Sequence, residues 1–192
     1  MAVLEILAYP NPFLRKVAQK VTQFDDSLKQ IVANMSETMV KSDGLGLAAT
    51  QVGLDMQLFI LSPLAFKEKD EELQPGEVDL VFINPEIVEQ SKEEYLSSEG
   101  CLSFPDVYIN VSRPEWVVVK ALDINGTPFE MKGEQLGARA MLHEMDHLSG
   151  KVMIDHVSYF NRQRALNKHQ KVQKILAEEK AKNNGKKMGV KK

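Results

Sequence analysis

The stretch Ala140-Met141-Leu142-His143-Glu144-Met145-Asp146-His147-Leu148-Ser149-Gly150 contains two histidines four residues apart, with a glutamate directly after the first. On an α-helix, residues i and i+4 lie on the same face, so His143 and His147 can direct ring nitrogens at one metal ion. Glu144 lies about 100° further around the helix, where its carboxylate reaches a water bound to that metal. The spacing therefore predicts a metal-binding helix with Glu144 as general base.

The residues around this motif favour a helix. Gly150 follows the second histidine, where a left-handed residue commonly ends a helix. Apolar positions at helical spacing are supplied by Leu136, Ala140, Met141 and Leu148. The two-histidine pattern also arises by chance, so the rest of the chain has to supply the remaining parts of a site.

Length and composition indicate one globular domain. The chain has 192 residues, of which 43% are hydrophobic and 27% charged, which is sufficient for one sizeable core. The N-terminus lacks the basic and apolar segments of a secretion signal, and no run of eighteen apolar residues occurs. We expect a monomeric cytoplasmic protein without a membrane segment. A single cysteine excludes an internal disulfide.

Charge is unevenly distributed along the chain. Residues 168–192 contain nine lysines and two glutamates, which gives this segment a charge of +7 and the remainder about −10. A basic segment on an acidic body suggests contact with nucleic acid or the ribosome. A solvated helix followed by a frayed end is the alternative, and composition does not decide between them.

The remaining pattern predicts an α+β fold. We expect helices over 13–21, from an N-cap at Asp25-Asp26-Ser27 onward, and from Ser158 to about Lys180, with disorder from Asn183. The second helix carries an apolar stripe of Leu28, Ile31, Val32, Met35, Met39 and Val40. Strand patterns cover 57–62, 80–84, 86–98, 107–111, 116–123 and 128–132, with Asn125-Gly126 as a hairpin turn. Strands that do not alternate with helices indicate antiparallel or mixed sheets, packed around the motif helix.

A second candidate segment is Asp43-Gly44-Leu45-Gly46-Leu47-Ala48-Ala49-Thr50-Gln51. It lacks the glycine and lysine spacing of a phosphate-binding loop. Its glycines allow another backbone to approach closely, so a peptide-like ligand would fit against Gly44, Leu45 and Gly46. Gln51 adds an amide donor at the end of this small-residue run.

The lone cysteine, Cys101, lies between Gly100 and Leu102 in a loop flanked by serines. As a thiolate it completes a set of two histidines and one cysteine, and leaves a fourth metal position for water, as in catalytic sites. A cysteine–histidine nucleophilic pair and a buried, inert thiol are the alternatives.

Two other metallohydrolase classes share the His-Glu-x-x-His pattern. In thermolysin-like enzymes the third ligand is a downstream glutamate, and Glu178 or Glu179 could formally serve, although both lie in a lysine-rich stretch. In metzincins a third histidine follows the motif, but this chain has Met153 at that position, which excludes the ordinary metzincin site.

Taken together, three segments resemble the peptide deformylase family. They are Gly44-Leu45-Gly46-Leu47-Ala48-Ala49-Thr50-Gln51, Glu99-Gly100-Cys101-Leu102-Ser103, and His143-Glu144-Met145-Asp146-His147-Leu148 with Gly150. Their order and separations also agree, and the resemblance extends to about residue 165. Leu142 stands where this family often carries glutamine, which leaves the ligand set intact.

The resemblance implies a metallohydrolase that removes the formyl group from the N-terminal formylmethionine of nascent polypeptides. It implies that Cys101, His143 and His147 hold one divalent metal, natively iron(II), with zinc, nickel or cobalt as alternatives after isolation. Glu144 is then general base and acid, and the Gln51 side chain and the Leu102 N–H stabilise the oxyanion. Gly44, Leu45, Gly46 and Gly100 are expected to contact substrate.

The resemblance also implies a catalytic domain over residues 1–165. Residues 166–192 are expected to form the end of the C-terminal helix and a basic, partly disordered tail, a candidate ribosome contact. We further expect Glu99 to pair with Arg113 and so orient the ligand loop. A zinc endopeptidase and a ribosome- or RNA-associated module remain the competing hypotheses.

Overall fold

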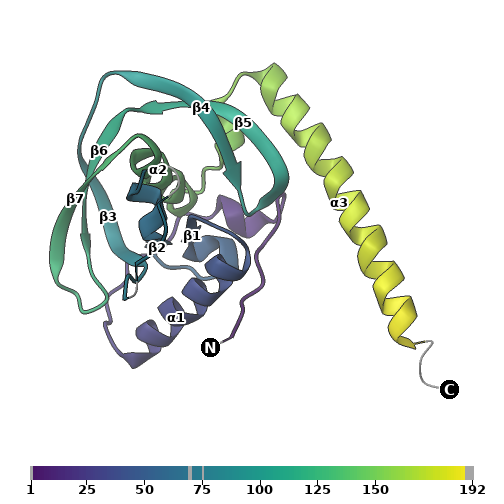
Figure 1. Ribbon diagram of the computed structural model, residues 1–192, viewed down its shortest axis with the longest axis horizontal. Helices are drawn as coiled ribbons and strands as arrows, with labels where there is room; N and C mark the ends of the chain where they lie inside the picture. The colour runs from purple at the N-terminus through teal and green to yellow at the C-terminus, as the bar shows by residue number, and fades with distance from the viewer. Residues whose placement is uncertain (1, 69–70, 75, 189–192) are drawn as a thin grey trace.

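The computed structural model describes residues 2–68, 71–74 and 76–188 (Figure 1). The longest helices in this part of the chain are α1 (Asp26–Lys41), α2 (Gln135–Leu148) and α3 (Tyr159–Met188). Short 3-10 helices occur at η1 (Pro12–Arg15), η2 (Ala49–Val52), η3 (Pro63–Phe66) and η4 (Met153–His156). Within the described ranges, no helix is both long and apolar enough to cross a bilayer.

The strands form two separate antiparallel sheets. The larger has the order β1-β2-β3-β6-β7, from β1 (Gly46–Ala48), β2 (Leu58–Leu61), β3 (Leu80–Gln90), β6 (Trp116–Leu122) and β7 (Pro128–Glu134). The smaller is a hairpin of β4 (Glu94–Cys101) and β5 (Phe104–Pro114). The predicted α+β class with antiparallel sheets is therefore confirmed.

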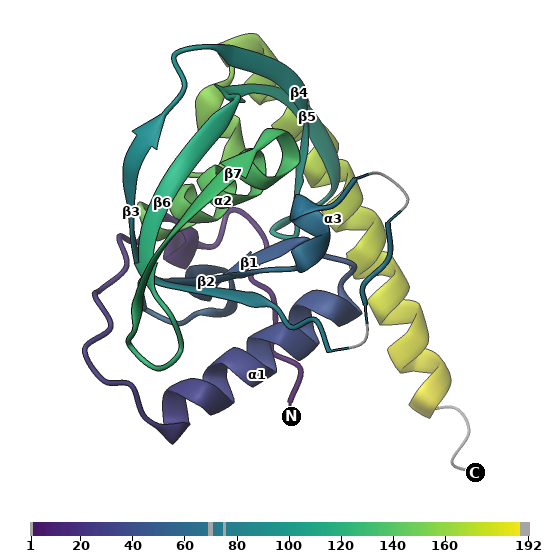
Figure 2. The ribbon, with the colours of Figure 1, turned by 60° about the vertical axis from the view of Figure 1, so that its left-hand side comes forward.

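Helix α2 lies among the strands, between the larger sheet and the β4–β5 hairpin (Figure 2). Its apolar face joins one core cluster with the larger sheet, which includes Ala138, Met141, Phe59, Phe82 and Val119, all buried. Because the apolar face packs on the larger sheet and the histidine face is buried too, most residues of α2 are buried. The His143–His147 motif is therefore carried by an enclosed helix.

The capping of α1 agrees with the sequence. The Asp25 carboxylate accepts hydrogen bonds from the N–H groups of Ser27 and Leu28. Leu28, Met35 and Met39 of the predicted apolar stripe are buried, whereas Val40 is 64% exposed. At 100° per residue Val40 points about 120° away from Leu28, so it lies off the buried face.

Two predicted elements differ from the structure. The helix expected over 13–21 is only the turn Pro12–Arg15, because Val17 then pairs with Ser149 and the Ala18 N–H donates to the Leu148 carbonyl. The strand expected over 86–98 is divided between β3 and β4. Ser91 makes the turn between them, since its hydroxyl donates to the Glu93 carbonyl and accepts from the Trp116 N–H.

Helix α3 continues to Met188, past the predicted end near Lys180. Its alanine, lysine and glutamate residues favour helix, and one internal glycine costs only about 1 kcal/mol. The first half packs on the molecule through the buried Ala165 and His169. The second half projects away from the body (Figures 1 and 2). Residues 189–192, part of the segment expected to be disordered, lie outside the described residues.

Candidate metal centre

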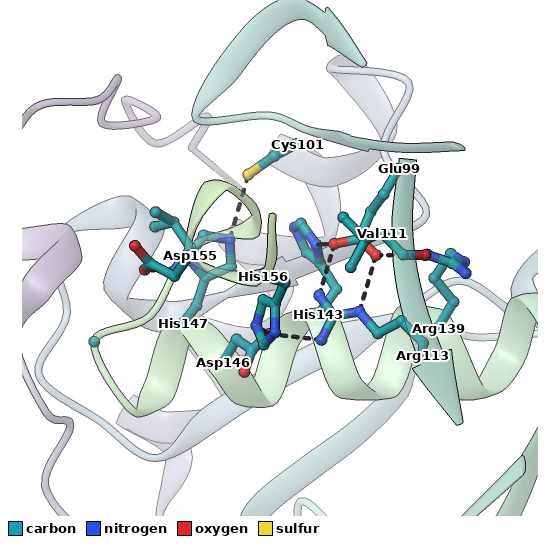
Figure 3. A network of polar contacts seen from close by, with 12 residues as sticks. Glu99, Cys101, Val111, Arg113, Arg139, His143, Asp146, His147, Asp155 and His156 are labelled. Atoms are coloured by element: carbon teal, nitrogen blue, oxygen red, sulfur yellow. Dashed lines mark hydrogen bonds and ion pairs between the residues drawn. The ribbon is translucent and has the colours of Figure 1, made fainter. Parts of the chain in front are cut away.

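Three metal-ligating side chains meet where β4 ends against α2. The thiol of Cys101 and the imidazoles of His143 and His147 present ligand atoms that all lie within 4.8 Å of one another. Cys101 Sγ is 3.3 Å from His147 Nε2 (Figure 3). Both histidines are buried and Cys101 is partly exposed. The alternative ligands Glu178 and Glu179 are exposed on α3, outside this cluster.

The local geometry of the hairpin directs Cys101 toward the helix. The β4–β5 pairing shifts register between Gly100 and Cys101, so that Cys101 pairs with Phe104. Such irregularities bend a strand and redirect its side chains. On the helix side, Gly150 has φ of +70°, the left-handed conformation expected after the last turn of α2.

The charges of the cluster suit a divalent cation. Burial raises the pKa of the Cys101 thiol, but the adjacent His147 and His143 have the larger effect and lower it to about 5. Burial disfavours the charged form of His143 too and so lowers its pKa. Cys101 and Glu99 outweigh this effect and raise the pKa of His143 well above its usual value. The cluster thus favours a thiolate paired with positive charge. A soft thiolate and two imidazoles are a donor set that zinc and iron accept, so these residues fit a bound metal.

Glu99 orients one of the ligands. Its Oε1 lies 2.6 Å from His143 Nδ1, which leaves His143 Nε2 free to face the ligand cluster. Arg113 donates to both oxygens of Glu99, at 3.0 and 2.7 Å. Burial raises the pKa of Glu99, but His143 and Arg113 hold it well below its usual range. The structure thus brings together the Glu99 and Arg113 pair that the sequence suggested.

Three further charged or polar residues join this network without having been predicted. Arg139 Nη1 donates to Glu99 Oε2 at 2.9 Å, and Arg113 Nη1 donates to Asp146 Oδ2 at 2.7 Å. His156 Nε2 lies 2.7 Å from the same Asp146 oxygen. Arg139 stands four residues before His143, so the i, i+4 rule that linked the histidines could have found it. Nothing in the sequence pairs Asp146 with η4.

Glu144 lies in the same cavity, against the backbone of β1. A Cβ atom on Gly46 would overlap Glu144 Oε1, and would also lie 2.8 Å from Leu61 Cδ2. Burial raises the pKa of Glu144 to about 7, and its Oε2 has no hydrogen-bond partner in the described part of the chain. A carboxyl group with these properties can exchange a proton near neutral pH.

The other predicted site residues line one cavity of about 840 Å³. The Gln51 side chain accepts from the Ala48 N–H at 2.8 Å, and its amide donates to Cys101 Sγ at 3.6 Å and to Ser103 Oγ at 3.2 Å. A Cβ on Gly44 would meet the Leu102 side chain at 2.8 Å, and one on Gly100 would meet the Tyr108 ring at 2.7 Å. Residues of the three sequence segments lining this cavity include Gly44, Leu45, Gly46, Gln51, Glu99, Gly100, Cys101, Leu102, His143 and Glu144.

Comparisons with known proteins agree with this geometry. Residues 3–163 match the family described as polypeptide deformylase. A peptide deformylase from Cellvibrio japonicus is 45% identical over 174 residues, covering 91% of this chain and 98% of that protein. The crystal structure of a peptide deformylase from Legionella pneumophila superposes with a TM-score of 0.82 at 40% identity, covering 92% of this chain and 98% of that one. A structure from Ehrlichia chaffeensis, in complex with actinonin, gives a TM-score of 0.80 at 36% identity, covering 89% and 98%.

Proposed function

The chain belongs to the polypeptide deformylase family, and from this premise we propose that it is a metallohydrolase that releases formate from the N-terminal formylmethionine of newly made polypeptides. The observation that carries the proposal is the meeting of Cys101, His143 and His147 at the wall of a cavity that Cys101, His143 and the buried Glu144 line. The family is metal-dependent, and this cluster is the candidate site for its ion.

Cys101, His143 and His147 would hold a divalent ion, which would supply Lewis-acid chemistry by bringing the pKa of a water molecule toward 7. Glu144 accepts the proton of the attacking water as the oxygen–carbon bond forms. It then delivers that proton to the amine nitrogen as the carbon–nitrogen bond breaks. Formate and a free methionine amine are the products.

Gln51 and Leu102 stabilise the developing oxyanion. The Ala48 N–H holds the Gln51 side-chain oxygen, so its amide group is directed toward Cys101 and the reacting centre. The backbone N–H of Leu102, next to the cysteine ligand, is the second donor. Each such donor is worth about 3 kcal/mol when it is aimed at the oxyanion.

The substrate backbone lies along Gly44, Leu45 and Gly46, where small residues leave space, with Gly100 on the opposite wall. An apolar methionine side chain fits the Leu45 and Leu102 side of the cavity. We assign iron(II) as the native metal, as the resemblance to the family implies. Zinc, nickel or cobalt can replace it during isolation, because such donor sets bind these ions more tightly than iron(II).

Residues 1–165 are the catalytic domain in this proposal, and the protein works in the cytoplasm as a monomer. The segment 166–192 contacts the ribosome, where formylated chains emerge, through its lysine-rich charge.

A zinc endopeptidase would instead cleave internal peptide bonds and would not need Cys101. Actinonin, present in the Ehrlichia chaffeensis structure, should bind in this cavity as well.

The first experiment is to measure formate release from formyl-Met-Ala-Ser by anaerobically purified protein, with bound metal determined in parallel. Glu144→Ala should keep its metal and lose turnover by a factor of about 100 or more. If the metal-loaded wild type releases no formate, the deformylase proposal fails. If it instead cleaves blocked internal peptides, the endopeptidase hypothesis replaces it.

A further inference from the structure

We propose that Arg139 is a positioning residue that holds the β4–β5 hairpin, which carries Cys101, against α2, which carries His143 and His147. In this way it sets how tightly the three side chains retain a divalent metal. The inference rests on the metal-dependent function proposed above, and it adds to that function a residue outside the three sequence segments that resemble the family.

The need for such a residue follows from the sheet topology. Strands β4 and β5 pair with each other and belong to a sheet separate from the one on which α2 packs. No described backbone ladder therefore sets the separation between Cys101 and the histidines. Isolated backbone hydrogen bonds join the ends of the hairpin to the rest of the molecule, such as the Tyr9 N–H to the Ser103 carbonyl. Side-chain contacts between the hairpin and α2 then contribute to the separation at the cluster itself.

Arg139 provides three of these contacts from a single side chain. Its Nη1 donates to Glu99 Oε2 at 2.9 Å and to the Val111 carbonyl at 3.0 Å. Its Nη2 donates to the Tyr95 carbonyl at 3.2 Å. The three acceptors lie on both strands of the hairpin (Figure 3 shows Glu99 and Val111), so one planar group fastens β4 and β5 to α2 together.

The surroundings of the guanidinium exclude a surface role. Arg139 is 4% exposed, its charge is balanced by Glu99, and its guanidinium carbon lies 4.9 Å from the Tyr95 ring centroid. It also borders the cavity that Cys101 and His143 line. A buried cation with carbonyl acceptors on both strands is placed to fix the separation between the hairpin and α2 rather than to improve solubility.

Arg113 does not duplicate this arrangement. It projects from β5 and bonds Glu99 and Asp146, so it also keeps Glu99 ionised. The hydrogen bonds of Arg113 go to Glu99 and Asp146, whereas Arg139 donates to the Tyr95 and Val111 carbonyls from the helix side. Loss of Arg139 should therefore loosen the hairpin while Glu99 keeps a cationic partner.

The test compares Arg139→Met, Arg139→Lys and a control, Arg162→Met, each loaded with Co²⁺ alone. Arg162 bonds the Ile154 carbonyl and Asp155, away from Glu99. The readouts are the rate of Co²⁺ loss to excess EDTA and the thiolate-to-cobalt absorption band. We expect Arg139→Met to lose Co²⁺ about 10- to 100-fold faster with a shifted band, Arg139→Lys to lie between it and wild type, and Arg162→Met to match wild type.

If Arg139→Met loses Co²⁺ at the wild-type rate and its thiolate-to-cobalt absorption band is unchanged, the proposal is overturned. If that variant does not fold, as judged by urea unfolding, Arg139→Lys decides. Lysine keeps the charge but not the planar fork, so wild-type Co²⁺ release in Arg139→Lys is then the contradicting result. Neither readout uses turnover. A wild type that holds Co²⁺ but releases no formate would refute the deformylase function and leave this inference standing.

Discussion

At the scale of single residues, the site depends on contacts between segments far apart in the chain. Gly46 was expected to contact substrate, and the structure shows a further reason for glycine there, since the Glu144 carboxylate occupies the space of a side chain. Because Leu61 closes the other side, the carboxylate is the group that a Cβ would displace.

Gly46→Ala should therefore reduce kcat about 10- to 100-fold with unchanged metal content, because displacement of a catalytic group by about 1 Å is sufficient for such a loss. Steady-state kinetics and metal analysis check this. Gly137→Ala is the matched control, since its Cβ would meet the Phe66 ring and not Glu144. A Gly46→Ala enzyme with wild-type kcat would contradict the assignment.

The acid limb of the pH profile should report Glu144. Burial raises its pKa to about 7, and only the ionised form accepts a proton, so kcat/KM should fall up to tenfold per pH unit below that pKa. A bound divalent cation favours the ionised form and moves the limb to lower pH. Measurements from pH 4 to 9 with the metal-loaded enzyme test this. An acid limb centred above pH 7, or a profile that stays flat down to pH 4 while the protein remains folded, contradicts Glu144 as the base.

The candidate site residues that could be predicted are those that lie close together in the sequence. The His143 and His147 spacing and the short segment around Cys101 can be read along the chain. Arg139 was missed because a lone arginine in a helix usually faces solvent, and here the acceptors that bury it come from two strands. The contact of Gly46 with Glu144 joins positions nearly a hundred residues apart, and no local pattern encodes it.

At the scale of elements, the end of α2 is held by the segment after η1. Ala18 donates to the Leu148 carbonyl, and a Cβ on Gly150 would lie 2.5 Å from the Arg15 carbonyl oxygen. Arg15 also pairs with Asp155 of η4. The N-terminal segment thus packs against the turn that follows His147, one of the three candidate metal ligands.

Gly150→Ala should lower the free energy of unfolding by about 2–4 kcal/mol, because it combines a left-handed backbone with a backbone clash. Gly126→Ala is the control, with φ of +81° but a contact of 3.3 Å to the Phe24 ring, and should cost only about 1 kcal/mol. Urea unfolding at fixed metal concentration compares them. Equal losses would show that the Arg15 contact does not matter.

Element boundaries were predictable where capping or turn residues mark them. Asp25 and Asn125-Gly126 define a helix start and a hairpin that the structure confirms. The division between β3 and β4 was missed because a serine side chain, not a glycine or proline, makes that turn. The helix expected over 13–21 is replaced by an extended segment because Val17 and Ala18 pair with the backbone at the end of α2. This tertiary contact outweighs local helix preference.

At the scale of the whole molecule, α3 joins two different environments. Ala165 and His169 are buried against the body, and His169 Nε2 lies 2.6 Å from the Tyr9 carbonyl oxygen. Beyond Leu176, every residue whose side chain the structure describes is exposed. The distal half of α3 therefore contributes little to the stability of the body.

Deletion of residues 177–192 removes six lysines and two glutamates. We expect formate release to be unchanged and the free energy of unfolding to change by less than about 1 kcal/mol. Association with ribosomes at low salt should weaken several-fold, because fewer phosphate charges are neutralised. Sedimentation with ribosomes at two salt concentrations tests this. Unchanged association at low salt would remove the distal tail from the proposed contact.

The placement of Cys101 on one sheet and of the two histidines on a helix of the other has a consequence for the living cell. An ion that binds only the assembled set adds to folding stability by mass action, about 1.4 kcal/mol for each tenfold rise in free ion above its dissociation constant. The population of unfolded chains open to proteases then falls as the metal supply rises. Nutrient metal levels would thus govern how long each molecule survives as well as how many are active.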